Sequence, residues 1–217
     1  MSDDDKYVAC SCGEPPSVNS FFEGFPKIKR WNRDIIITEK IDGTNAQILI
    51  PDFGGVFTFK SERTVPFLVG SRTRWIFPEN DNHGFAKWAY SNVDTILGLG
   101  PGKHFGEWWG QGIQRGYGLK EKRFSLFNTE RWNKETLPNG IGVVPVLYKG
   151  PMYTVGEEED TQAHSIIEYI LERLRESGSW AAPGYMKPEG IVIFHTASNH
   201  CYKVTLENDE MPKSLVV

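Results

Sequence analysis

Between Ile35 and Ile50 the sequence reads IIITEKIDGTNAQILI, and this stretch constrains the fold more than any other part of the chain. Its isoleucine and leucine runs favour buried β-strands over Ile35–Glu39 and Ala46–Ile50. A polar Lys-x-Asp-Gly cluster separates the two runs. One interpretation is a hairpin that turns at Asp42-Gly43 and leaves Lys40 exposed. The other is a pair of strands that brings Lys40 to the mouth of a pocket.

The remaining sequence indicates an α+β fold, because short strand-like segments separated by Gly, Pro and Asn are interrupted by helices at irregular intervals. Further strands are expected at Val56–Phe59, His104–Trp108, Phe124–Asn128, Gly190–His195 and Cys201–Thr205. Two segments with helical spacing of apolar residues are expected to be helices, Gly84–Leu99 and Asp160–Ser179, the second ending near Gly178.

Composition limits the class of protein. The chain has 217 residues, 39% of them hydrophobic, which suits one domain with a well-formed core. No apolar run is long enough to span a bilayer, so no membrane partner is expected. The acidic N-terminus has no apolar signal core, and three cysteines cannot all pair within one chain. We therefore expect a reducing, cytoplasmic location.

A net charge of -4 argues against nucleic-acid binding over the whole surface. Two stretches nevertheless place cations beside aromatic residues, PKIKRWNR (Pro26–Arg33) and SRTRW (Ser71–Trp75). That pattern suits phosphate contact with base stacking. It suits equally well solvated cations that lie next to core tryptophans.

Three familiar motifs are incomplete. GLGPGKH (Gly98–His104) lacks the spacing and the hydroxyl of a phosphate-binding P-loop, and GQGIQRG (Gly110–Gly116) has Arg115 where a dinucleotide fingerprint needs its third glycine. Cys10 and Cys12 could join His200 and Cys201 around zinc, but zinc sites use more widely spaced pairs.

Lys40 is the residue with the clearest chemical potential. A lysine amine becomes a nucleophile for carbon or phosphorus once it loses its proton. Gly43 permits a tight turn and close approach of a ligand to the backbone. Thr44 and Asn45 add neutral hydrogen-bonding groups at the same place.

Six short segments, in this order, resemble the motifs of the covalent nucleotidyltransferases, the superfamily of polynucleotide ligases and mRNA capping enzymes. TEKIDGTN is similar to motif I, in the form typical of RNA ligases of the phage and RNA-editing type. The others are GSR (Gly70–Arg72), HFGEWW (motif III), RFSLFN (motif IIIa), PEGIVI (motif IV) and CYKV (motif V). The resemblance extends from about Pro26 to Lys203. It implies a nucleotidyltransferase fold of twisted antiparallel sheets flanked by helices, with residues 1–25 as an extension and 26–217 as one domain.

The resemblance also implies a role for each motif residue in ATP-dependent chemistry. Lys40 would attack the α-phosphorus and form a lysyl–AMP phosphoramidate, with Glu189 and Lys203 as the other catalytic residues. Glu189 and Glu107 would bind Mg²⁺ or Mn²⁺, and Glu107 would also accept from the ribose hydroxyls. The other nucleotide contacts would be Glu39 at the purine edge, Asp42, Gly43, Asn45, Arg72 on phosphate, and Phe127 stacked on the base, with Phe124 in reserve.

By resemblance, the chain seals 5′-phosphate to 3′-hydroxyl ends of RNA, including ends in a nicked duplex. Motif V departs from the ligase pattern because Val204 and Thr205 follow Lys203, so that a second lysine is missing; Lys213 or Arg74 could substitute. No OB domain is expected after motif V, so a separate partner domain is a candidate for closing the site. Two alternatives remain: a capping-type guanylyltransferase, and a non-catalytic protein that binds nucleic-acid ends.

Overall fold

The computed structural model describes residues 22–59, 63–152, 166–207 and 209 of the chain. Contacts divide the chain into two units, Met1–Arg30 and Trp31–Val217. In the first unit, residues 22–30 are exposed and form neither helix nor strand. The second unit carries the helices and sheets discussed below.

The described residues of the second unit form twelve strands and three α-helices, with short 3-10 turns between some of them. The strands are β1 (Asp34–Lys40), β2 (Thr44–Ile50), β3 (Phe57–Thr58), β4 (Thr64–Val65), β5 (Leu68–Gly70), β6 (Trp75–Ile76), β7 (Gly102–Gly110), β8 (Lys122–Leu126), β9 (Ile141–Val143), β10 (Val146–Pro151), β11 (Gly190–His195) and β12 (His200–Thr205). The α-helices are α1 (Phe85–Ser91), α2 (Val93–Leu97) and α3 (Ile166–Ser177), and the 3-10 turns are η2 (Asp52–Gly54), η3 (Pro78–Asn80) and η4 (Gly116–Gly118).

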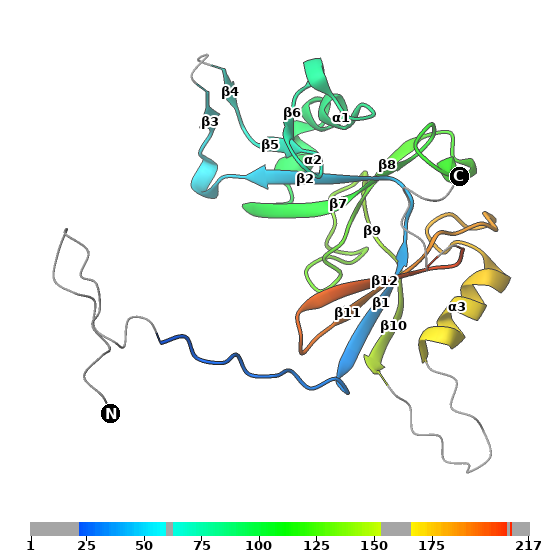
Figure 1. Ribbon diagram of the computed structural model, residues 1–217. Coiled ribbons are helices and arrows are strands. Elements are labelled where there is room, and N and C mark those ends of the chain that lie inside the picture. Colours follow the sequence, from blue (N-terminus) through cyan, green and yellow to red (C-terminus); the bar gives the residue numbers. More distant parts are fainter. Residues whose placement is uncertain (1–21, 60–62, 153–165, 208, 210–217) are drawn as a thin grey trace, which may run out of the picture. The chain divides into compact units, whose positions relative to one another are not determined.

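These strands form two larger sheets, ordered β10-β1-β11-β12 and β6-β5-β2-β7-β8-β9, while β3 and β4 pair separately. Every strand pair is antiparallel except β8 with β9, which is parallel. Consecutive strands β1 and β2 belong to different sheets, so the Lys-x-Asp-Gly segment joins the two sheets (Figure 1). The hairpin interpretation of this segment is therefore wrong.

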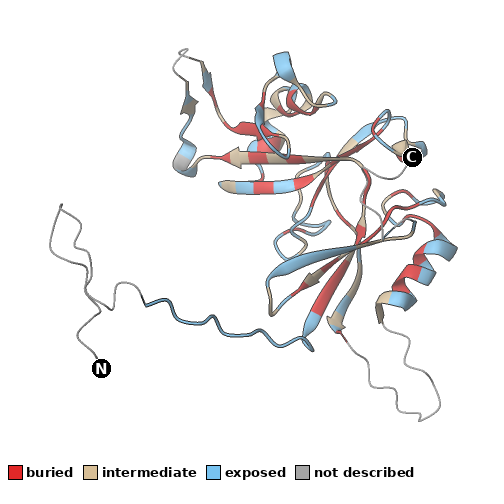
Figure 2. Cartoon of the chain, in the orientation of Figure 1, coloured by how far each residue is buried: buried red, intermediate tan, exposed pale blue. Residues whose placement is uncertain are grey.

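Each large sheet has its own hydrophobic core. Helices α1 and α2 cover the six-stranded sheet, where Ile48, Phe85 and Trp108 are among the buried residues. Helix α3 packs on the four-stranded sheet through Ile170, Leu171 and Leu174, and its outer side is exposed (Figure 2). This is the amphipathic stripe expected from the sequence.

A third, smaller core lies next to the segment that joins the sheets. It contains Ile41, Trp109, Tyr117, Val144 and Ala182, which come from five separate parts of the sequence. The turn after Lys40 is therefore packed on one side by buried apolar groups, which restricts its movement.

The expected strands are present, β11 with the expected bounds and the others with shifted ends, but five strands were not predicted: β4, β5, β6, β9 and β10. The helix expected over Gly84–Leu99 is two helices, because Asn92 leaves helical geometry (φ -126°, ψ 44°) and donates its side-chain amide to the Trp88 carbonyl. Asparagine competes with helical hydrogen bonds in this way.

The second expected helix is present as α3, although residues 160–165 of that expectation lie outside the described part of the chain. Gly178 follows α3 with φ +75°, the left-handed conformation usual after a helix. Among the described residues, no helix is long and apolar enough to cross a membrane.

Candidate active site

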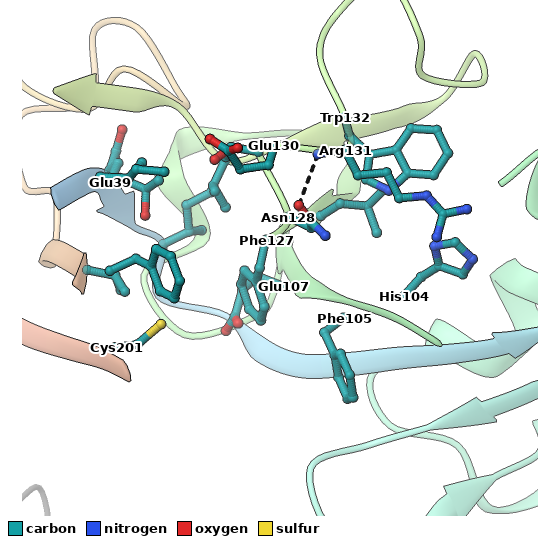
Figure 3. A pocket seen from close by; sticks show the side chains of 18 of the residues that line it. Glu39, His104, Phe105, Glu107, Phe127, Asn128, Glu130, Arg131, Trp132 and Cys201 are labelled. Atoms are coloured by element: carbon teal, nitrogen blue, oxygen red, sulfur yellow. Dashed lines mark hydrogen bonds between the residues drawn. The ribbon is translucent and has the colours of Figure 1, made fainter. Parts of the chain in front are cut away.

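A cavity of about 710 Å³ lies between the facing surfaces of the two large sheets. Thr38, Lys40, Val192 and Cys201 line it from the four-stranded sheet, and Phe105, Glu107 and Phe127 from the opposite side. In Figure 3, Glu107 and Phe127 lie near the middle of the view, while His104, Arg131 and Trp132 group at one end. A volume of this size suits a nucleotide or another small ligand.

Lys40 ends β1 and is paired with a buried carboxylate. Its Nζ lies 2.6 Å from Glu189 Oε2, and the side chains are 20% and 3% exposed. The sheet register explains this contact, because Lys40 is opposite Gly190 on β11 and Glu189 precedes that glycine. The predicted nucleophile thus lies in the cavity wall, beside one of the predicted carboxylates.

Glu107 on β7 is the second carboxylate near Lys40. One of its oxygens accepts a hydrogen bond from the Gly43 amide at 3.1 Å. Burial raises the pKa of Glu107 to about 7; the negative charges of Glu189 and Asp42 act in the same direction, while the Lys40 ammonium and the Gly43 amide oppose them. Asn45 on β2 lies directly opposite Glu107 in the sheet.

Gly43 allows this close packing. A Cβ atom added to it would lie 2.5 Å from the Trp108 carbonyl oxygen, 2.7 Å from Trp109 Cβ and 2.9 Å from Glu107 Cγ. All three contacts are shorter than side chains tolerate, so the turn requires glycine because of close approach.

Glu39 faces away from Lys40, as alternation along a strand requires. Its buried carboxylate accepts hydrogen bonds from Ser179 Oγ, the Trp180 amide (2.7 Å) and the Ala181 amide (2.8 Å). Burial raises the pKa of Glu39, and these three hydrogen bonds act in the opposite direction. Glu39 is nevertheless among the residues that line the cavity, so its expected contact with a purine edge stays a prediction.

Asp42 is tied to the segment between β7 and β8. Its carboxylate pairs with Arg115 Nε at 3.1 Å, and its amide donates to Tyr117 Oη at 2.8 Å. Neither partner was named from the sequence as a site residue. The only sequence feature near Arg115 is the glycine-rich stretch GQGIQRG, which resembles an incomplete dinucleotide-binding motif and does not indicate a contact with Asp42.

The two motif IIIa phenylalanines have different environments. Phe127 is 39% exposed and lines the cavity, whereas Phe124 is fully buried and packs against Phe85 at a ring distance of 5.0 Å. The choice of Phe127 as the stacking residue is therefore compatible with the fold. Phe124 has no access to the cavity, because it fills the core under α1, so its reserve role is wrong.

Two predicted site residues, the phosphate contact Arg72 and the catalytic residue Lys203, are open to solvent. Arg72 is exposed in the loop after β5, and Lys203 is exposed on the edge strand β12. Lys203 lies opposite Val192, a cavity residue, so it projects from the cavity side of the sheet. Neither residue makes a hydrogen bond or an ion pair with the described residues.

One end of the cavity has side chains that sequence reasoning missed. His104 Nε2 donates to the Gly100 carbonyl at 2.9 Å, and its ring lies 5.9 Å from that of Trp132. The Arg131 guanidinium lies 4.9 Å from the Trp132 ring centre. Burial lowers the pKa of His104. His104 begins the motif III segment, although no role was assigned to it, and Arg131 and Trp132 belong to no motif.

Glu107 and Glu189 are the carboxylates that could hold a divalent metal. Within the described ranges, no group of three or more His, Cys, Asp or Glu residues is arranged to bind an ion. Magnesium is usually held by one or two carboxylates together with substrate phosphates and water. The residues therefore fit an ion that binds jointly with a phosphate ligand, and they do not form a preassembled cage.

Of the cysteines considered for a zinc site, one lies in the cavity wall. Cys10 and Cys12 lie outside the described residues, and Cys201 is a free thiol in the cavity wall whose pKa is raised by burial. The Trp31 ring stacks on His195 at 5.5 Å, and Arg74 donates to the Asn80 carbonyl. Both stretches of cations and aromatics thus have local packing roles, and a nucleic-acid role for them stays a prediction.

The fold and the site define a class of protein, a mixed α/β chain rich in sheet, with a lysine and carboxylates beside a ligand-sized cavity between two sheets. Within that class the chain belongs to the RNA ligase family, since the sequence profile of that family matches residues 33–205. The resemblance to RNA ligases predicted from the ordered motifs is confirmed.

Solved structures of Naegleria gruberi RNA ligase are similar in fold. One variant with ATP and Mn matches at 17% identity and a TM-score of 0.50, over 82% of this chain and 51% of that chain. Another variant, with AMP and Mn, matches at 17% identity and a TM-score of 0.50, over 79% and 49%. This chain therefore spans about half the length of those structures, and at such identity the likeness concerns the fold alone. A comparison with curated protein sequences finds no match.

Proposed function

We propose that the chain is the nucleotidyltransferase domain of an ATP-dependent RNA ligase, with Lys40 as the residue that accepts AMP. The observation that carries this proposal is the Lys40–Glu189 contact of 2.6 Å in the wall of a nucleotide-sized cavity. Family membership supports it, as do the ATP and AMP complexes of the Naegleria gruberi enzyme. In this proposal residues 26–217 form the domain and residues 1–25 precede it.

The proposed first step is a displacement at the α-phosphorus of ATP. The Lys40 ammonium loses a proton, and its lone pair then forms the N–P bond while the bridging P–O bond breaks and its electrons leave with pyrophosphate. The nitrogen loses a second proton as the phosphoramidate forms. Glu189, already in contact with Nζ, is positioned to pass these protons to water.

The cavity residues orient the nucleotide in this proposal. Phe127 stacks on the base, and Glu107 accepts from the ribose hydroxyls. Asn45 adds a hydrogen-bonding amide beside Glu107, and Lys203 and Arg72 engage the phosphates. A divalent cation held by Glu107 and Glu189 together with the phosphates would neutralise their negative charge.

In the later steps AMP passes from Lys40 to a 5′-phosphate end, and a 3′-hydroxyl then displaces AMP as the phosphodiester bond forms. RNA ends, including those in a nicked duplex, are the proposed substrates, and a reducing cytoplasmic compartment is the proposed location. A partner domain remains a candidate for closing the site.

The test is to incubate the purified protein with ATP and Mg²⁺ or Mn²⁺ and to measure its mass. A mass increase of one AMP is expected in the wild type and in Lys87→Ala, which removes an exposed lysine of α1. Lys40→Ala should show no increase while keeping the wild-type circular dichroism spectrum. Labelling of Lys40→Ala would show that another residue is the nucleophile.

Two further results would favour the alternatives. Labelling by GTP and not by ATP would identify a capping-type guanylyltransferase. Salt-sensitive RNA binding without any nucleotide adduct would identify a non-catalytic end-binding protein. If an adduct forms, joining of a 5′-phosphorylated RNA strand to a 3′-hydroxyl strand tests the complete reaction.

A further inference from the structure

The glycine-rich segment between β7 and β8 has an unusual backbone. Gly110, Gly112, Gly116 and Gly118 all have positive φ angles, and so do two residues with side chains, Gln114 (φ +46°) and Tyr117 (φ +52°). Residues with a Cβ atom adopt such angles only where the surrounding structure compels them to. The segment is thus held in one conformation. The contacts made by its side chains indicate what this conformation positions.

Tyr117 fixes the segment in the small core beside the Lys40 turn. Its ring is buried and packs against those of Trp109 (5.0 Å) and Tyr185 (4.8 Å). Its hydroxyl accepts the Asp42 amide at 2.8 Å. The backbone of the turn after Lys40 is therefore hydrogen-bonded to an immobilised side chain.

Arg115 from the same segment makes two contacts with one guanidinium group. Its Nε donates to Asp42 Oδ2 at 3.1 Å, and its Nη1 donates to the Lys187 carbonyl at 3.1 Å. Asp42 lies two residues after Lys40, and Lys187 lies two residues before Glu189. The guanidinium thus joins the two chain segments that carry the Lys40–Glu189 pair.

The bridge lies where the sheet no longer holds these two segments. The β1–β11 ladder ends at the pair Lys40–Gly190, so Asp42 and Lys187 both lie beyond the last ladder residues. A planar guanidinium with donors in a fixed fork can hold two acceptors at a set separation, which a lysine ammonium cannot do.

We propose that Arg115 is a positioning residue for nucleotidyl transfer: by bridging Asp42 and Lys187 it sets the distance and direction between Lys40 and Glu189. This inference rests on the function proposed above. The side chains of Arg115 and Asp42 are 27% and 12% exposed, so loss of Arg115 leaves a largely buried carboxylate and should also lower the melting temperature. The rate of lysyl–AMP formation is therefore compared among variants that are shown to be folded at the assay temperature.

The experiment measures the rate of lysyl–AMP formation in single turnover over a range of ATP concentrations. Arg115→Ala is expected to lower the rate at saturating ATP about 10- to 100-fold, as small misplacements of reacting groups do. The ATP concentration for half-maximal rate should change less than about 2-fold, because Arg115 contacts protein groups only. Arg115→Lys should be nearly as slow, since one ammonium cannot replace the fork.

Two further measurements separate positioning from structure. Guanidinium chloride at low, non-denaturing concentration should partly restore Arg115→Ala, whereas sodium chloride at the same concentration should not. Arg63→Ala is the matched control, since Arg63 pairs with Glu79 at 3.2 Å on the exposed surface and should keep the wild-type rate. Arg115→Gln provides a second variant if Arg115→Ala does not fold.

Several results would overturn the inference. A wild-type maximal rate in a folded Arg115 variant would show that the bridge is dispensable. Full recovery in Arg115→Lys would show that only the positive charge matters. A raised ATP requirement at an unchanged maximal rate would make Arg115 a ligand of the nucleotide. If the wild-type protein forms no adduct, the proposed function fails, and this inference fails with it.

Discussion

The candidate site contains two groups of residues that differ in how firmly the surrounding structure holds them. The held group, Lys40, Gly43, Glu107 and Glu189, is fixed by hydrogen bonds and close packing where the two sheets join. The open group, Arg72, Phe127 and Lys203, is substantially exposed. The fold itself positions the held group before any ligand binds. The side chains of the open group, which would contact the bound nucleotide, are solvated until it binds.

The held group and the open group should therefore affect different kinetic quantities. Preorganised groups cost nothing to arrange at the moment of reaction, so changes to them should lower the rate. Open groups must be ordered by the substrate, so changes to them should mainly raise the substrate concentration required. The predictions below test whether this division holds.

The largest effect is expected from Gly43→Ala, which disturbs the held group directly. The added methyl group would lie 2.5 Å from the Trp108 carbonyl oxygen and 2.7 Å from Trp109 Cβ. Relieving those contacts must move the turn that carries Lys40. We expect the unfolding free energy to fall by about 1–3 kcal/mol, and the rate of lysyl–AMP formation to fall about 100-fold. Urea denaturation and single-turnover labelling measure the two effects.

Gly55→Ala is the control for this substitution, since Gly55 is exposed and a Cβ there would meet no atom closer than 3.2 Å. Its stability and labelling rate should stay close to wild type. If Gly43→Ala were as stable and as fast as the control, the held group would be free to adjust, and the comparison would fail.

Sequence patterns predicted much of the fold because the strands that form the cavity carry strong local signals. The isoleucine runs of β1 and β11 and the leucine stripe of α3 are buried as expected. Short strands such as β5 and β6 were not predicted, because two or three residues are too few to show the alternating apolar and polar pattern of a strand. The path of the chain from β1 to β2 also escaped, because Asp-Gly is locally a hairpin signal and only tertiary pairing places the two strands in different sheets.

Only those site residues that belong to a recognisable motif were predicted from the sequence. Lys40, Glu107 and Glu189 were identified by motif order, and the fold brings them together. The orientation of Glu39 could have been inferred, since adjacent strand residues face opposite ways. The position of Arg115 could not be inferred, because it depends on positive φ angles at Gln114 and Tyr117, residue types that rarely adopt them.

A second prediction concerns the cost of keeping Glu107 in the held group. Its pKa is raised from 4.5 to about 7, so between these values the folded protein binds a proton that the unfolded chain has lost. Stability should therefore fall as pH rises through this window and level off above about 7. Glu107→Gln keeps an oxygen for the Gly43 amide and removes the ionisation, so this decline should disappear.

Urea denaturation at pH 4.5 and pH 7.5, without nucleotide or metal, tests this expectation. The wild type should lose about 1–3 kcal/mol more than Glu107→Gln over this interval, making the variant the more stable protein at pH 7.5. The variant should also label more slowly with ATP. The more stable protein would then be the less active one, as in other stability–activity trade-offs. Parallel pH profiles for the two proteins would show that Glu107 ionises normally in the folded state.

The smallest effect is expected from Lys203→Ala, which removes a member of the open group. Lys203 is exposed on an edge strand and has no partner among the described residues, so the unfolding free energy should change by less than about 0.5 kcal/mol. Its proposed phosphate contact is worth about 1 kcal/mol at an exposed position. The ATP concentration for half-maximal labelling should therefore rise about 3- to 10-fold, with the maximal rate nearly unchanged. A large loss of maximal rate instead would make Lys203 a catalytic residue, as expected from the sequence, whose contact strengthens in the transition state.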